Sequence, residues 1–280
     1  MTDAILSVIS WINDMIFGLG ANGSSLTSSL HGFMPGLYSY SSTIQQNVIM
    51  PVAYVVLALF FVLELHKASI RTDGMGGGTT NLGAEVVFKV MFKMVLIKIA
   101  LDSTSLILNA VYNATTYLTS GIAGVLGGNA GAGGGLDPVA LEPAIDALGF
   151  WAGLVILILC FIIFLVAMIA YALANIVIAT RFIELYVYFA VAPIPLATLP
   201  SDEMSQIGKG FLKSFAAVCF QGVILFLVMS FFPILFNGIF ASADAGDVML
   251  ALLGVLGYAI VLILAIFQTG KWAKSITGAM

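Results

Sequence analysis

The stretch ALGFWAGLVILILCFIIFLVAMIAYALANIVIAT (Ala147–Thr180) contains no charged residue, and Arg181 follows it directly. About 20 helical residues are enough to cross the hydrocarbon core of a bilayer, which is about 30 Å thick. This stretch is longer, so a helix formed by it must tilt or project beyond the bilayer. It therefore predicts a transmembrane helix.

The composition extends this conclusion to the whole chain. Of its 280 residues, 61% are hydrophobic and 9% are charged, and the mean hydropathy is +1.10. A soluble domain of this length cannot bury so much apolar surface. We therefore expect an all-α polytopic membrane protein. The net charge of −4, without a basic tail or patch, argues against nucleic-acid binding as the primary function.

The apolar segments predict five transmembrane helices, at about residues 44–65, 84–113, 147–180, 208–240 and 248–269. Pro51 is expected in the first turns of the first helix, where its missing N–H costs least. Four regions follow: an extracytoplasmic helix and loop (1–43), two spans with a cytoplasmic loop (44–113), a glycine-rich extracytoplasmic loop (114–146) and the remaining spans (147–280).

The topology is predicted from the basic residues. Cytoplasmic loops collect Lys and Arg, and all ten of these residues can lie inside only if residues 182–200 do not cross. Pro193 and Pro195 break that segment, which favours a re-entrant or interfacial hairpin. The N-terminus is then outside and the C-terminus is cytoplasmic. Six complete spans are the alternative.

Residues 4–19 have apolar positions at helical spacing, with polar residues on the other side. The segment contains no Lys or Arg, so we expect it to pack on protein rather than bind anionic lipid. Residues 20–43 are rich in Gly and Ser and predict a loop. Candidate contacts for a homo-oligomer are Ile9 and Ile12 on the apolar stripe, and Gly149 and Gly153, whose spacing allows close helix approach.

Five charged residues fall in or near the apolar segments: Glu64, Lys98, Asp102, Arg181 and Glu184. Charge inside a bilayer is costly and usually faces protein or water. Lys98 and Asp102 are four residues apart on one helix, so they can pair. We favour a self-satisfied buried pair over a polar stripe that lines a conduit or a subunit seam. Arg181 and Glu184 are expected to anchor the broken segment at the membrane interface.

No catalytic motif is present. The stretch GKGFLKS (Gly208–Ser214) lacks the spacing of a phosphate-binding loop, and neither HExxH nor GxSxG occurs. Cys160 and Cys219 lie inside apolar runs, where free cysteine behaves as a small hydrophobe. We expect no enzyme activity, no metal site and no cofactor.

After Arg181 and Glu184, the stretches AVAPIPLATL (Ala190–Leu199) and IGKGFLKSFAAVCFQG (Ile207–Gly222) resemble TrbL-like polytopic subunits of conjugative type IV secretion systems. Three further stretches look similar to the compact members from Gram-positive mobile elements: PVAYVVLALFFVLEL (51–65), EVVFKVMFKMVLIK (85–98) and the closing GKWAKSITGA. The short outer loop departs from the larger members.

The resemblance implies a non-enzymatic channel or scaffold subunit of the cytoplasmic (inner) membrane. Such subunits oligomerise, contact lipid, the system's ATPases and its other membrane subunits, and help to move DNA or protein substrate. Two other interpretations stay open: a secondary transporter or small-solute channel, and a membrane anchor or assembly chaperone of an unrelated complex. Against a transporter, the sequence has no inverted repeat and only one broken segment, where repeats would give two.

Overall fold

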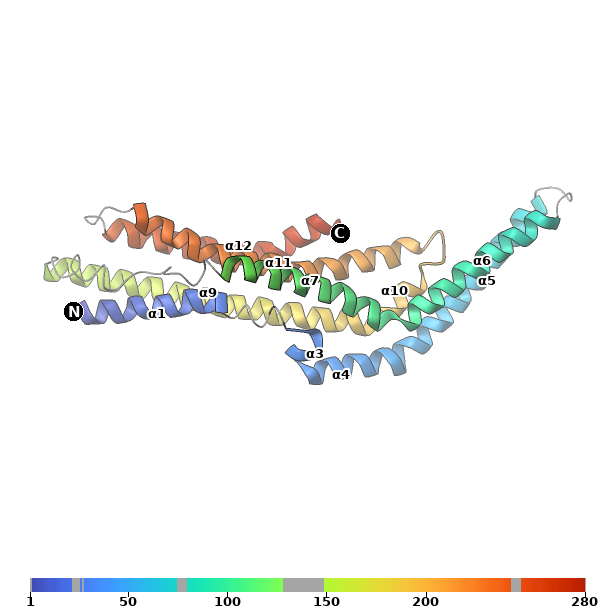
Figure 1. The fold of residues 1–280 in the computed structure, drawn as a ribbon, viewed down its shortest axis with the longest axis horizontal. Helices are drawn as coiled ribbons and strands as arrows, with labels where there is room; N and C mark the ends of the chain where they lie inside the picture. The colour runs from blue at the N-terminus through green and yellow to red at the C-terminus, as the bar shows by residue number, and fades with distance from the viewer. Residues whose placement is uncertain are drawn as a thin grey trace. The chain divides into compact units, whose positions relative to one another are not determined.

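Helices account for nearly all residues that the computed structural model describes, which are 2–21, 26, 28–74, 80–127, 149–242 and 248–279. No strand occurs within those ranges (Figure 1). The elements are α1 (Thr2–Ala21), α3 (Leu30–Phe33), α4 (Pro35–Ile44), the π-helix η1 (Gln45–Ile49), α5 (Met50–Gly74), α6 (Thr80–Asp102), α7 (Thr104–Gly127), α9 (Phe150–Val191), α10 (Pro193–Ala197), α11 (Ser205–Ser242) and α12 (Val248–Thr277).

Four helical stretches are long and apolar enough to cross a membrane: Pro35–Ile70, Phe150–Val191, Ser205–Phe232 and Met249–Thr277. A fifth candidate is the pair Glu85–Asp102 and Thr104–Val125, which is bent by 66°. The predicted class of helical polytopic membrane protein is confirmed. Four or five spans agree with the five predicted from the sequence.

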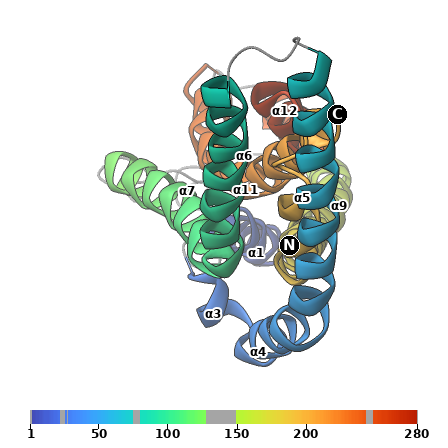
Figure 2. The ribbon, with the colours of Figure 1, turned by 90° about the vertical axis from the view of Figure 1, so that its right-hand side faces the viewer.

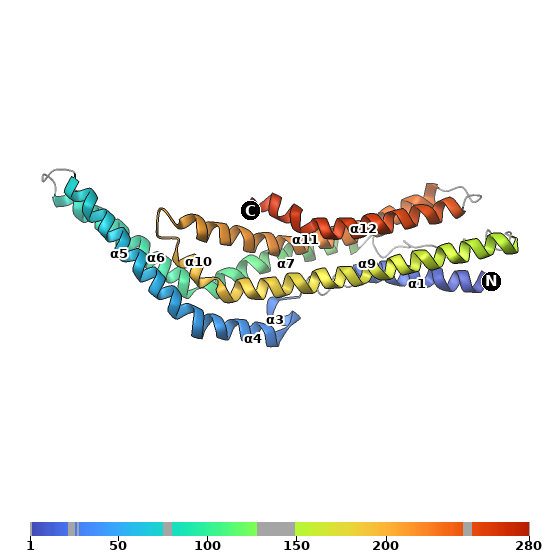
Figure 3. The ribbon, with the colours of Figure 1, turned by 180° about the vertical axis from the view of Figure 1, so that it is seen from behind.

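The chain divides into two units. Unit 1 comprises Met1–Ser28, Thr115–Arg181 and Phe220–Ala273, and unit 2 comprises Ser29–Ala114, Phe182–Cys219 and Lys274–Met280. Within unit 1, α1 runs beside α9 (Figures 1 and 3), and the rings of Trp11 and Phe164 lie 5.9 Å apart. Ile5, Ile9 and Ile12 of the apolar stripe are buried, as a helix with one apolar face requires.

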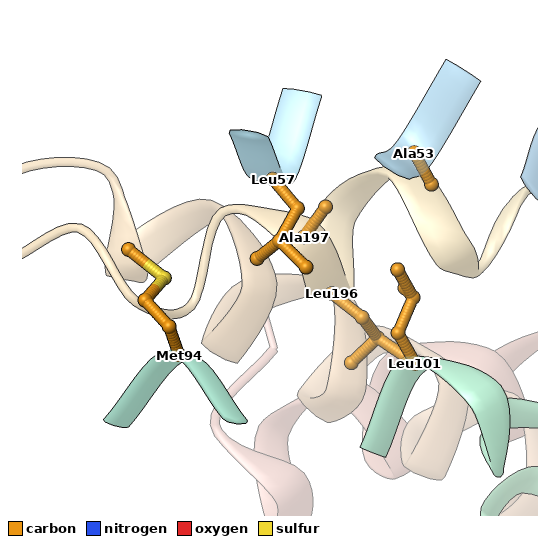
Figure 4. Close-up of a cluster of buried hydrophobic side chains, with 6 residues drawn as sticks. All are labelled: Ala53, Leu57, Met94, Leu101, Leu196 and Ala197. Carbon is orange, nitrogen blue, oxygen red and sulfur yellow. The ribbon is translucent and has the colours of Figure 1, made fainter. Parts of the chain in front are cut away.

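Within unit 2, α5 and α6 lie side by side as a helical hairpin (Figures 1 and 2), and α10 packs against both. Their shared core consists of Ala53, Leu57, Met94, Leu101, Leu196 and Ala197, each at most 9% exposed (Figure 4). Alanine at two of these positions leaves room for α10 near the hairpin. Burial of such apolar side chains stabilises the contact by about 25 cal/mol per Å².

Two differences concern the start of the chain. Residues 30–43, which belong to the predicted loop 20–43, lie almost entirely in α3 and α4. The Oγ of Ser29 accepts the N–H of Gly32 at 3.0 Å and caps α3, and Phe33 stacks on Phe182 of α9 at 3.7 Å. Pro51 is the second residue of α5, but it does not begin the helical stretch, because α4, η1 and α5 follow one another without a break.

The second predicted helix, 84–113, is two helices. The chain bends at Ser103, and the Thr104 hydroxyl donates to the Leu101 carbonyl at 2.6 Å. Serine and threonine hydroxyls that bond the preceding turn compete with the backbone ladder and bend helices. The α7 helix then continues to Gly127, beyond the predicted start of the 114–146 loop. Residues 128–146 of that loop lie outside the described residues.

The predicted broken segment, 182–200, starts later than expected. The α9 helix continues without interruption through Arg181 to Val191, because no glycine or proline interrupts residues 182–191. The break comes at Ala192, where α10 and then a turn over residues 198–204 follow. Both prolines therefore lie at the break, but the ten residues before it extend α9.

Candidate functional site

The break after α9 has a specific partner. In a continuous helix the Phe189 carbonyl would accept the N–H of residue 193, but Pro193 has none. The Nε2 of Gln45 donates to that carbonyl instead, at 2.9 Å. Gln45 is 2% exposed, so this hydrogen bond is shielded from solvent. A buried carbonyl needs such a partner, and the side chain from η1 supplies the donor that proline removed.

Gln45 did not stand out in the sequence. Its neighbour Gln46 has the same side chain but is exposed. The only available signal was a proline in the middle of an apolar run, which predicts an unpaired carbonyl four residues earlier. The sequence does not reveal which side chain, 144 positions away, would satisfy it.

An ionic cluster ties the turn over residues 198–204 to the α5–α6 hairpin. Lys93 of α6 pairs with Asp202 at 2.7 Å, and Lys67 of α5 pairs with Glu203 at 2.9 Å. The backbone N–H of Asp202 also donates to the Oε1 of Glu64 at 3.3 Å. A pocket of about 340 Å³ lies beside these groups. Glu64, expected as a charge in or near the apolar segments, is thus one member of this cluster.

The start of α11 packs closely on the same region. A Cβ on Gly208 would lie 2.7 Å from the Pro195 carbonyl oxygen and 2.7 Å from Leu199 side-chain atoms. Only glycine fits there without displacement. Pro193 and most of α10 are buried, so the broken segment is part of the core of unit 2.

Lys98 and Asp102 form the ion pair that their spacing allows, at 3.1 Å. The hydroxyl of Tyr54, on α5, also donates to Asp102. The prediction of burial is wrong, because the side chains of Lys98 and Asp102 are 62% and 41% exposed. An apolar groove of about 330 Å³ runs from Tyr54 and Lys98 between the two helices.

Arg181, expected as an interfacial anchor, is only 3% exposed, so the chain itself encloses its side chain. Its guanidinium lies against Gly222 of α11, where an added Cβ would be 2.1 Å from the Cζ atom. Glycine at 222 therefore makes the space that the buried side chain occupies. Glu184, in unit 2, is half-buried.

The residues proposed for oligomer contacts differ in their surroundings. Ile9 and Ile12 are 1% and 0% exposed, so the chain itself covers the side chains that were expected to meet a neighbour. Gly153 is also buried. Gly149 is exposed, and an added Cβ there would meet nothing within 4 Å. Of these four positions, only Gly149 lies open to a second molecule.

Within the described residues, no group of three or more His, Cys, Asp or Glu side chains is placed to hold a metal ion. Cys160 and Cys219 do not form a disulfide, and both are buried. The polar side chains described above make structural contacts between helices. Together with the long apolar helices, they define a helical membrane protein in which ion pairs and a hydrogen bond hold the proline-broken segment against neighbouring helices.

The comparison with protein families identifies this membrane protein more closely. Residues 18–193 match the model of the TrbL/VirB6 plasmid conjugal transfer-like family. The match covers more than half of the chain, and the chain belongs to this family. It is thus a membrane component of conjugal transfer and type IV secretion, from a family of structural subunits that is not known for enzymes. No curated protein matches the chain significantly.

The matched region contains α4 to α9 and ends at Pro193. The resemblance inferred from the sequence is confirmed at the level of the family. The stretch Ile207–Gly222, which contributed to that resemblance, lies beyond the matched residues.

Proposed function

We propose that this protein is a scaffold or channel subunit of a conjugative type IV secretion system. In this function it assembles in the cytoplasmic membrane and assists the transfer of DNA or protein substrate without catalysing a reaction itself. The observation that carries the proposal is the family match over residues 18–193. The arrangement of helices and ion pairs in unit 2 supports a fixed framework, because its charged side chains tie separate helices together.

The ionic cluster supports the hairpin topology. Asp202 and Glu203 pair with Lys93 and Lys67, so the turn over residues 198–204 lies at the same end of the α5–α6 hairpin as those lysines. A segment that crossed the membrane completely would separate these charges by the thickness of the bilayer. We therefore infer that residues 192–204 return to the side from which α9 emerges.

The other end of the chain agrees with this topology. A Cβ on Gly278 would lie 3.9 Å from the Nζ of Lys213, so the start of α11 and the C-terminal residues lie at one end of unit 2. Lys67 and Lys93 pair with the turn that precedes α11, and the positive-inside rule favours a cytoplasmic position for these lysines and Lys213. We therefore propose five spans, an external N-terminus and a cytoplasmic C-terminus.

The cytoplasmic partners would meet the start of α11 rather than the buried α10. Asp202 and Glu203 have side chains that are 68% and 74% exposed, and the neighbouring Met204 and Ile207 are 45% and 52% exposed. Exposed apolar residues rimmed by charge are typical of interaction sites. We propose this surface, residues 202–207, for docking of an ATPase or another subunit of the system.

The test is removal of the gene from its conjugative element, followed by complementation. Transfer to recipient cells should be lost and should return with the wild-type chain, and the purified protein should form a homo-oligomer in lipid nanodiscs. Unchanged transfer in the deletion strain would overturn the proposal. A monomer in lipid that takes up a small solute would favour a transporter instead.

A further inference from the structure

On the topology proposed above, the polar group formed by Tyr54, Lys98 and Asp102 lies inside the membrane. Lys93 pairs with Asp202 in the turn, at the end proposed as cytoplasmic, and Asp102 lies nine residues further along α6, or about 14 Å at the helical rise. On α5, Tyr54 lies thirteen residues from Lys67, or about 20 Å. Half of the hydrocarbon core is about 15 Å thick. With the ionic cluster at the cytoplasmic boundary, the group lies close to the middle of the bilayer.

At that depth the exposure of these side chains has consequences. Lys98 is 62% exposed and Asp102 is 41% exposed, while the neighbouring Val95 and Ile99 are 54% and 57% exposed. Ionised side chains near the bilayer centre are costly in lipid, and they face protein or a water-filled space. The face of the hairpin that carries the ion pair therefore has an occupant other than lipid tails.

The surroundings favour protein over a water-filled space. The groove that adjoins Lys98 is lined by Leu57, Ala58, Phe61 and Met91, among others, and only Tyr54 and Lys98 contribute polar atoms. A water-filled conduit would need polar groups along its length. An apolar groove with polar groups at one end fits a helix that brings apolar side chains and one polar contact.

We propose that this face, defined by Tyr54, Lys98, Asp102 and the apolar groove, is the interface with a second copy of the chain. The inference rests on the proposed function, which includes a homo-oligomer. A second copy inserted with the same topology carries an ammonium and a carboxylate at the same depth. Lys98 of each copy can then meet Asp102 of its neighbour, and no unpaired charge enters the membrane.

Charge balance is the reason for choosing a second copy as the occupant. The Lys98–Asp102 pair is neutral as a whole, so a partner with a single charge at this depth would leave one ion without a counter-ion. Uncompensated charge in low dielectric is strongly unfavourable. A second neutral pair avoids that cost and adds hydrogen bonds, since the Lys98 ammonium has three donors.

The test uses charge inversion and mixing. K98D carries two acidic groups on this face and D102K carries two basic ones, so each alone should lose the oligomer through like-charge repulsion. Co-expressed with different tags, the two variants should purify together, because opposite charges now meet between chains. The double variant K98D/D102K keeps a neutral pair within each chain and should assemble with itself.

Cross-linking provides a second measurement that does not change the charges. In a background with Cys160 and Cys219 replaced by alanine, Val95→Cys in the groove should form a disulfide-linked dimer in membranes. The control Leu96→Cys is exposed to a similar degree, 51% against 54%, but does not line the groove. It should cross-link much less.

The outcomes separate this interface from the proposed function. An oligomeric wild type, without rescue on mixing and without a Val95→Cys dimer, overturns the interface and leaves the scaffold function intact. A wild type that is monomeric in lipid overturns the homo-oligomer itself. If charge inversion prevents insertion of either variant, the cross-linking result decides, and equal cross-linking at positions 95 and 96 would contradict the interface.

Discussion

Replacement of Gln45 by leucine should destabilise unit 2 through a single atom, the carbonyl oxygen of Phe189. That oxygen accepts the Gln45 Nε2 at 2.9 Å in a site where Gln45 is 2% exposed. Leucine fills similar volume but donates no hydrogen bond. A buried carbonyl left without a partner costs about 1–3 kcal/mol, and we expect that loss in the free energy of unfolding.

The matched control is the neighbouring residue. Gln46 lies in the same π-helix but is exposed, so Gln46→Leu should change stability by less than about 0.5 kcal/mol. Unfolding of the purified variants in a mixed detergent system, followed by the loss of helical circular dichroism, measures both. The comparison removes the general effect of a more apolar helix.

A second background tests the assigned cause. Pro193→Ala restores a backbone N–H that can donate to the Phe189 carbonyl. In that background Gln45→Leu should cost less than in the wild type, by roughly the 1 kcal/mol of one hydrogen bond. An equal cost in both backgrounds, or a cost for Gln45→Leu no larger than for Gln46→Leu, would refute the idea that Gln45 compensates for the proline.

Three further predictions concern other contacts. Gly208→Ala should lower the stability by about 1–3 kcal/mol, as overpacked contacts do, because its Cβ would lie 2.7 Å from a backbone oxygen. The control is Gly210→Ala, whose Cβ would meet nothing within 4 Å. Equal melting temperatures for the two alanine variants would contradict the overpacking at Gly208. Ile12→Asp should lower the folded yield of the chain, because Ile12 is 0% exposed and an unpaired buried charge costs about 3–5 kcal/mol. The control Ser7→Asp, on the exposed side of α1, should leave the folded yield unchanged. Asp202→Asn should lower the free energy of unfolding by less than about 1 kcal/mol, as the loss of an exposed ion pair does. The difference from wild type should shrink as salt is added. A large loss of stability that does not depend on salt would show that the side chain has another function.

The sequence was most informative where one segment determines its own structure. The apolar stripe around Ile5, Ile9 and Ile12 predicted an amphipathic helix, and the structure has α1 there with all three side chains buried. The long uncharged run after Gly149 predicted a membrane helix, which is α9. Periodicity and length are local properties, so a single chain is enough to read them.

The contacts that shape unit 2 could not be read in this way. Lys93 and Asp202 are 109 residues apart, and Gln45 and Phe189 are 144 apart. Neither pair has a spacing signal, because their proximity depends on how helices from distant parts of the chain pack. The bend at Ser103 was missed for a different reason, since serine and threonine are also common in straight helices.

The exposure of individual side chains was also predicted incorrectly from the sequence. Lys98 and Asp102 were expected to be buried because a charged pair in an apolar run usually faces protein. In the isolated chain they are exposed, and Ile9 and Ile12, chosen as contacts for a neighbour, are covered by the chain itself. Which side of a membrane helix faces its own bundle depends on packing partners, which the hydropathy pattern does not identify.

The position of the turn over residues 198–204 relative to the membrane is the point on which the five-span topology depends. Single cysteines at Met204 and Trp151, which are 45% and 78% exposed, can be compared in a background with Cys160 and Cys219 replaced by alanine. With a membrane-impermeant maleimide on intact cells, Trp151→Cys should be labelled and Met204→Cys should react only after the membrane is opened. Labelling of Met204→Cys in intact cells, with Trp151→Cys protected or labelled equally, would contradict the topology.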